Sequence, residues 1–204
     1  MTVLDTKSCN HFWQYLTKLV IKNKLYYKSI FTGILMVFSH LAFSQNWKLV
    51  SNTITFKVKH AFGSTAEGSF KGLNSSIYFD TNQLSKTSMN TSLEARTIDT
   101  DLGLRDKTLR GTKYFDVEKY PTIRITCTQV ERDAKANEYL GTFEVTIKNK
   151  TKSLKIPFNF IQTSNTGQFR ATFQINRLDF SIGESSALLG DIVTIFVTLN
   201  TIVI

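Results

Sequence analysis

Residues 142–160 have the sequence TFEVTIKNKTKSLKIPFNF, in which apolar and polar side chains alternate in both halves. The first half carries apolar residues at every second position from Phe143 to Ile147, and the second half repeats this from Leu154 to Phe160. Successive side chains of a strand point to opposite faces, so each half predicts a strand with one apolar face. The polar link from Lys148 to Lys152 predicts a short turn between them. This stretch therefore predicts an antiparallel hairpin.

The same alternation recurs along most of the chain after residue 45. The apolar-face positions of the other predicted strands are Ile54, Phe56, Val58, His60 and Phe62; Met89, Leu93 and Ala95; Ile123, Ile125 and Cys127; Phe169, Ala171, Phe173 and Ile175; and Val193, Ile195, Val197 and Leu199. A further run contains Phe70, Ile77 and Phe79 and is broken by Gly72. An open sheet of about eight strands without covering helices would expose its edges. We therefore predict an all-β fold, a closed antiparallel barrel of about eight strands.

One segment departs from this alternation and predicts a single short helix over 101–110. Thr100 is a candidate N-cap, and Gly111 is a candidate stop. Acidic and basic residues also stand four apart within the segment, as in helical ion pairs. We expect this helix to lie across one end of the barrel.

The first 44 residues have the order of a secretory signal peptide. Lysines from Lys18 to Lys28 precede an apolar run, Ile30–Phe38, and Ala42-Phe43-Ser44 then offers small residues for cleavage. The apolar run is about half of the roughly 20 residues that span a bilayer, which disfavours a permanent anchor. We therefore expect residues 1–44 to be a signal peptide. The mature domain, 45–204, would be exported to the periplasm or secreted.

The basic charge of the chain does not predict a nucleic-acid partner. The formal net charge is +9, but residues 45–204 keep only 20 basic and 15 acidic residues, spread mostly singly along the strands. The densest basic cluster, Lys148 to Lys155, falls in the predicted hairpin and is typical of a solvated turn. No aromatic and basic residues converge in a recognisable binding module.

Residues for catalysis or metal binding are scarce. After residue 44, His60 is the only histidine and Cys127 the only cysteine, so a multi-histidine or multi-cysteine metal site is excluded. The sequence has no Gly-x-Ser-x-Gly elbow, phosphate-binding loop or His-Glu-x-x-His motif. A carboxylate pair assembled in space stays open. We expect no enzyme, no catalytic residue and no metal site.

The apolar face carries the candidate ligand-binding residues: Phe56, Val58, His60, Phe143, Phe158, Phe160, Phe173 and Arg177. The rings can form a packed core, but an eight-stranded barrel can also leave room for one ligand. His60 and Arg177 fall on the same face by parity. Arg177 can be a buried group paired with Asp179 or Asp106, or a strand-end residue. Alternatively, both residues meet the polar head of a ligand near the barrel mouth.

Four stretches together carry a family resemblance. They are Ser64–Phe70 leading into Gly72; Ile98-Asp99-Thr100 followed by Arg105-Asp106 and Leu109; Lys113-Tyr114-Phe115-Asp116 with Tyr120-Pro121; and Asn176-Arg177-Leu178-Asp179-Phe180. Over residues 46–204 the chain resembles the YceI-like, polyisoprenoid-binding family. His60 falls where the family has a histidine, whereas Ser181 stands where the family commonly has glycine.

The resemblance implies a lipocalin-like extended barrel, exported in many members, that holds an isoprenoid chain such as a quinone or polyprenyl tail. We therefore expect the protein to bind, store or transport a long apolar isoprenoid-type lipid, with no cofactor beyond that lipid or quinone. Two alternatives stay open. One is a structural or interaction domain whose barrel is filled by side chains, and the other is a small-molecule enzyme that uses His60.

Overall fold

The computed structural model of this chain describes residues 45–204. The predicted signal peptide, 1–44, lies outside the described residues. Within the described part, no helix is both long and apolar enough to cross a membrane.

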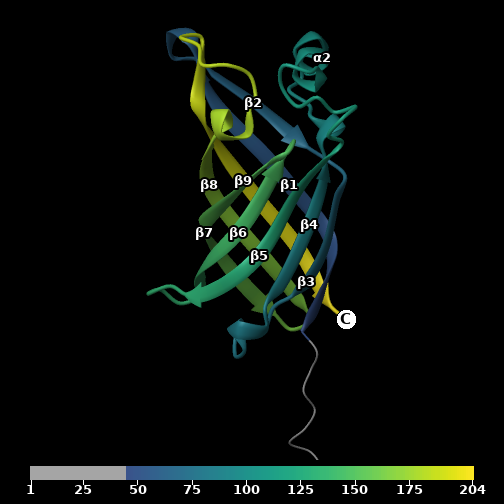
Figure 1. The fold of residues 1–204 in the computed structure, drawn as a ribbon. Coiled ribbons are helices and arrows are strands. Elements are labelled where there is room, and N and C mark those ends of the chain that lie inside the picture. Colours follow the sequence, from purple (N-terminus) through teal and green to yellow (C-terminus); the bar gives the residue numbers. More distant parts are fainter. Residues whose placement is uncertain (1–44) are drawn as a thin grey trace, which may run out of the picture. The chain divides into compact units, whose positions relative to one another are not determined.

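The described residues form one antiparallel β-barrel (Figure 1). Its strands are β1 (Asn46–His60), β2 (Thr65–Phe70), β3 (Leu73–Tyr78), β4 (Ser88–Glu94), β5 (Thr122–Arg132), β6 (Glu138–Ile147), β7 (Lys150–Thr163), β8 (Thr166–Asn176) and β9 (Leu189–Val203). The helices among these residues are α2 (Gly103–Arg110) and four short 3₁₀ turns, η1 (Ala61–Gly63), η2 (Leu84–Lys86), η3 (Ala95–Thr97) and η4 (Arg177–Phe180). The barrel closes because β9 pairs with β1 along almost its whole length. The predicted closed barrel is thus confirmed.

Nine strands occupy eight positions around this barrel, because β2 and β3 share one. Both pair with β1 in the same register, with Phe70 opposite Ile54 and Ile77 opposite Trp47. The chain breaks between them at Gly72, whose φ of +72° lies in the left-handed region that glycine adopts without strain. The predicted break at Gly72 is therefore correct.

The predicted hairpin is β6 and β7, joined by the two residues Lys148 and Asn149. Lys148 has a φ of +55°, as the tight turns that suit strand twist require. Val145 and Ile156 are buried, as their parity predicted. The alternation in 142–160 thus sets both the register of the hairpin and the face it turns inward.

The short helix forms, but it begins two residues later than predicted and without the predicted cap. Leu102 occupies the N-cap position and makes no side-chain cap. Thr100 lies two residues before the N-cap, and its Oγ1 accepts from the Arg105 side chain at 2.8 Å in place of a backbone N–H of the helix. Its own backbone N–H and hydroxyl donate to the Asp106 carboxylate. Gly111 ends the helix as predicted.

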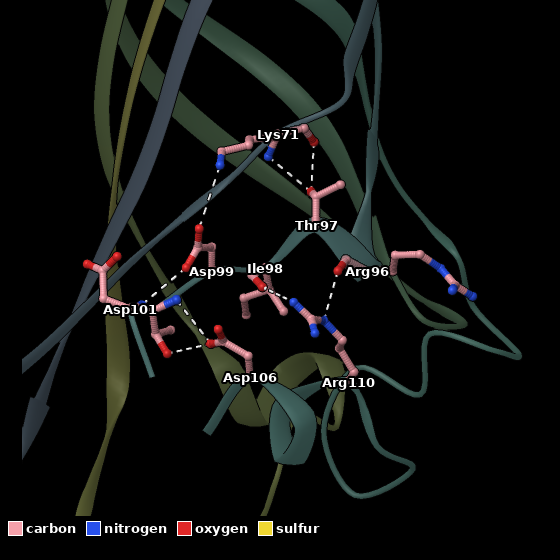
Figure 2. Close-up of polar contacts among 9 residues, drawn as sticks. Lys71, Arg96, Thr97, Ile98, Asp99, Asp101, Asp106 and Arg110 are labelled. Atoms are coloured by element: carbon pink, nitrogen blue, oxygen red, sulfur yellow. Dashed lines mark hydrogen bonds and ion pairs between the residues drawn. The ribbon is translucent and has the colours of Figure 1, made fainter. Parts of the chain in front are cut away.

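The arginines of this segment bind backbone carbonyls in place of the carboxylates four residues away. Arg110 donates from Nε to the Arg96 carbonyl at 2.9 Å and from Nη2 to the Ile98 carbonyl at 2.7 Å. Figure 2 shows how these bonds and the Asp106 contacts fasten α2 to residues 96–101. The helix is therefore held by tertiary contacts, at the barrel end opposite the C-terminus (Figure 1).

Inward-facing apolar residues form two clusters at different heights in the barrel. The lower cluster, near the C-terminus, is rich in rings: Trp47, Phe79, Tyr139, Phe158, Phe160 and Phe169. The Trp47 and Phe79 rings each meet Phe160 edge to face, with centroids 5.1 and 4.9 Å away, and Trp47 Nε1 donates to the Phe79 carbonyl at 2.9 Å. We call these six residues the aromatic floor, since they close this end of the barrel interior. The upper cluster is mainly aliphatic and includes Leu93, Val145, Ile175 and Phe180.

Candidate functional site

A cavity of about 720 Å³ lies within the barrel, lined chiefly by aliphatic and aromatic side chains. Pockets that hold small ligands commonly measure roughly 300–1,000 Å³. The walls come from alternate residues of the strands, for example Val193, Ile195 and Val197 on β9. These three side chains face inward yet remain only half-buried, because they border the cavity. The interior is thus part packed core and part lined space.

Seven of the eight predicted ligand-binding residues line this cavity: Phe56, Val58, His60, Phe143, Phe158, Phe173 and Arg177. Phe160 does not. Its ring is 2% exposed and packs between Trp47, Phe79 and Phe169 in the aromatic floor. Parity placed Phe160 on the correct face, but its height along the barrel puts it below the cavity.

Two cavity rings lie directly over glycines of the strands. A methyl group on Gly141 would come within 2.2 Å of the Phe143 ring, and one on Gly68 within 2.5 Å of the Phe56 ring. Each ring therefore lies flat against the barrel wall over its glycine. A larger residue at the glycine position would displace the ring. A glycine inside a strand pattern commonly marks such a close approach. Gly68 and Gly141 are therefore a signal for the cavity wall that the alternation of apolar and polar residues does not reveal.

Arg177 is buried at the cavity mouth and its donors are engaged by protein groups. It is 3% exposed and donates to the carbonyls of Ile182, Glu184, Leu189 and Gly190, at distances from 2.8 to 3.2 Å. Its Nη2 also meets Asp191 Oδ1 at 2.7 Å. A buried arginine paired with a carboxylate was one of our predicted alternatives, but the partner is Asp191 and neither Asp179 nor Asp106. Arg177 thus shapes the mouth by holding residues 182–191.

The segment that includes α2 supplies polar residues to the same mouth. Arg105 lines the cavity and donates from Nε to Thr100 Oγ1 at 2.8 Å and from Nη2 to the Thr100 carbonyl at 2.6 Å. Lys113 also lines the cavity, and its Nζ lies 3.1 Å from Glu184 Oε2 on the opposite loop. In the sequence, Arg105 and Lys113 stand out only within the predicted helix and the family motifs. Strand parity could not find them, since they lie outside the strands.

The remaining candidates for chemistry, His60 and Cys127, lie apart. His60 is exposed at the rim, and among the described residues its imidazole forms no hydrogen bond to a serine or a carboxylate. Cys127 is buried beside the aromatic floor, and burial raises the pKa of its thiol. A raised pKa lowers the thiolate fraction and makes the thiol a poorer nucleophile. The arrangement suits binding of an apolar molecule with a polar end at the mouth.

Solved structures with the same fold come from several bacteria. BcnA of Burkholderia cenocepacia is 22% identical, with a TM-score of 0.69 over 73% of this chain and 95% of that one. A polyisoprenoid binding domain from Saccharophagus degradans, implicated in plant cell wall breakdown, is 10% identical, with a TM-score of 0.63 over 79% of this chain and 99% of that one. These likenesses confirm the extended barrel.

Similarity in sequence extends to curated bacterial proteins. A UPF0312 protein of Pectobacterium atrosepticum is 31% identical over 135 residues, which cover 63% of this chain and 69% of that protein. A UPF0312 protein of Photorhabdus laumondii is 28% identical over 148 residues, covering 70% and 76%. The family model of the YceI-like domain matches residues 47–201, nearly the whole barrel. This chain therefore belongs to the YceI-like domain family.

Proposed function

We propose that the barrel binds a long apolar lipid of the isoprenoid type and stores or carries it without catalysing a reaction. The observation that supports this most directly is the cavity of about 720 Å³ with its aliphatic and aromatic walls. The Saccharophagus degradans neighbour, described as a polyisoprenoid binding domain, supports the chemical class of the ligand.

The shape of the interior favours one orientation of such a lipid. The aromatic floor closes one end, so the apolar tail would lie in the barrel and the polar head at the mouth, near His60, Arg105 and Lys113. Each CH₂ group removed from water is worth about 0.8 kcal/mol, so a tail of several isoprene units needs few polar contacts to bind tightly. Selectivity would then depend mainly on tail length.

We also propose that the protein is exported, with residues 1–44 removed as a signal peptide. The order of charge, apolar run and small residues before Gln45 supports this. N-terminal sequencing of protein recovered from outside the cytoplasm should give a start at Gln45. A start near Met1 in exported material would contradict cleavage.

Lipid extraction tests the binding proposal. Protein purified from its native host is extracted with organic solvent, and the extract is analysed by mass spectrometry. We expect an isoprenoid-type lipid in near-stoichiometric amount.

Ala171→Phe provides the matched perturbation, because Ala171 lines the cavity, and Ala134→Phe, in the exposed β5–β6 turn, is its control. If the space holds a ligand, Ala171→Phe folds normally and retains less lipid, whereas Ala134→Phe changes neither property. A protein that yields no lipid, and that Ala171→Phe destabilises as an overpacked core, would instead be a filled structural barrel.

A further inference from the structure

Three leucines at the mouth end of the barrel are strongly exposed. Leu102 and Leu104, at the start of α2, are 56% and 82% exposed, and Leu188, in the loop before β9, is 58% exposed. Both segments border the cavity, because Arg105 and Leu109 on α2 line it, as does Leu188 itself. Figure 1 shows α2 above the upper ends of β4 and β6. We call Leu102, Leu104 and Leu188 the mouth leucines.

The mouth leucines differ in position from the other large apolar residues that are exposed. Those others lie on strands or at the last residue of the chain: Val50, Ile161, Ile192, Ile202 and Ile204. Leu104 is the most exposed of all. Exposed apolar patches beside ligand-binding grooves commonly mark a protein- or membrane-contact surface.

Exposed lysines lie at the same end of the barrel. They are Lys59 at the end of β1, Lys107 on α2, and Lys150 and Lys152 at the start of β7. The β6–β7 turn belongs to the mouth end because Lys148 Nζ donates to the Ser181 carbonyl at 3.0 Å. Within residues 45–204, none of these four lysines forms an ion pair. We call the four the mouth lysines.

The mouth end also carries exposed carboxylates at Asp101, Asp179 and Glu184, the last of them paired with Lys113. The opposite end of the barrel is more evenly charged. Its β5–β6 turn carries exposed residues of both signs, with Glu131 and Asp133 beside Arg132 and Lys135. The two ends therefore differ in charge as well as in exposed leucines.

We propose that the mouth end of the barrel docks onto the surface of an anionic phospholipid bilayer. The mouth leucines would enter the boundary between head groups and acyl chains, and the mouth lysines would face the lipid phosphates. Docking in this orientation sets the cavity mouth against the bilayer, so an apolar ligand passes between membrane and barrel without crossing water. This inference goes beyond lipid binding, since a barrel can hold a lipid without contacting a membrane.

Vesicle co-sedimentation tests the docking surface. The protein used is residues 45–204, which contain the whole closed barrel and both apolar clusters and lack the apolar run at 30–38. The vesicles contain equimolar phosphatidylglycerol and phosphatidylcholine, with pure phosphatidylcholine as the uncharged comparison. We expect binding to the anionic vesicles that weakens at high salt, because salt screens the lysine contribution.

Variants at the two ends then locate the surface. Leu104→Asp should lower vesicle partitioning by about tenfold, and Lys107→Glu by about fivefold. The matched controls are Ile161→Asp on β7 and Lys86→Glu in η2, both exposed at the far end. Circular dichroism verifies that every variant is folded. We expect both controls to partition like the unmodified barrel.

Two results would overturn the docking proposal: no binding of the unmodified barrel to anionic vesicles, or equal losses for mouth and control variants. Mass spectrometry of the lipid retained by the same proteins distinguishes a failure of the docking proposal from a failure of the lipid-binding proposal. Leu104→Asp should keep its lipid while losing the vesicles. A barrel that carries no lipid but binds vesicles through its mouth leucines would overturn lipid binding alone.

Discussion

Arg177 holds one side of the cavity mouth in place. Its buried guanidinium donates hydrogen bonds to the carbonyls of residues 182, 184, 189 and 190 and to the Asp191 carboxylate. The planar, multi-donor guanidinium suits this task, which an ammonium group on a flexible stem could not perform. The loop that carries Leu188 is thereby fixed beside the cavity.

Replacing this arginine should destabilise the barrel measurably. In Arg177→Met, four carbonyls and the Asp191 carboxylate lose their donor, and we expect a loss of about 3 kcal/mol in the free energy of unfolding. Arg170→Met is the control, since Arg170 is exposed on β8 and forms no ion pair within residues 45–204. Urea denaturation followed by circular dichroism measures both. Equal stabilities for the two variants would contradict the role assigned to Arg177.

At the scale of elements, η4 ends in a residue whose backbone does not suit its side chain. Ser181 has φ +53° and ψ +40°, the left-handed conformation, and its N–H donates to the Leu178 carbonyl at 3.0 Å to close the turn. Glycine, which the family resemblance leads one to expect here, adopts this conformation without cost. The serine therefore carries strain that glycine would not.

Ser181→Gly should stabilise the protein by up to about 1 kcal/mol, because removing the β-carbon relieves the left-handed backbone. Ser185→Gly, in the exposed loop that follows, has no positive φ to relieve and should be neutral or slightly destabilising. Thermal unfolding of both variants gives the comparison. A gain in Ser185→Gly as large as that in Ser181→Gly would show that strain at Ser181 is not the cause.

Most of the strands could be predicted from the sequence, although Phe62 and Ala95, which were predicted at strand positions, lie in η1 and η3. The tertiary contacts of the helix could not be predicted. Alternation predicts a strand because the side chains themselves set which face is buried, as in 142–160. A cap depends on which group donates to the hydroxyl oxygen, and Thr100 Oγ1 accepts from the Arg105 side chain while its hydroxyl donates to Asp106. Spacing alone also could not show that Arg110 binds the carbonyls of 96 and 98.

At the scale of the whole molecule, the barrel interior divides into a packed floor and a lined cavity. Parity predicts that Phe160 and Phe173 both point inward, and they do. Parity cannot tell which ring packs against other rings and which ring borders the cavity. That depends on height along the barrel and on glycines in the strands. The sequence therefore could not predict which aromatic residues form the aromatic floor.

This division predicts that removing a ring from the floor and removing a ring from the cavity wall have different effects on stability and on lipid retention. Phe160→Ala removes a ring enclosed by Trp47, Phe79 and Phe169, so we expect a loss of about 4 kcal/mol in the free energy of unfolding, as for a packed core. Phe173→Ala removes a half-buried ring that already borders the cavity, so the loss should stay below about 2 kcal/mol.

The lipid content of each folded variant supplies the second measurement. Phe173→Ala enlarges the cavity and removes a wall contact, so it should retain less isoprenoid lipid than the unmodified protein when both are diluted into vesicle-free buffer. Phe160→Ala should retain lipid in proportion to the fraction that remains folded, because its ring lies outside the cavity lining. Denaturation curves and mass spectrometry on the same samples give both quantities. Equally large destabilisation at both positions, with lipid per folded molecule unchanged, would mean that Phe173 belongs to a packed core and that the cavity does not hold the ligand.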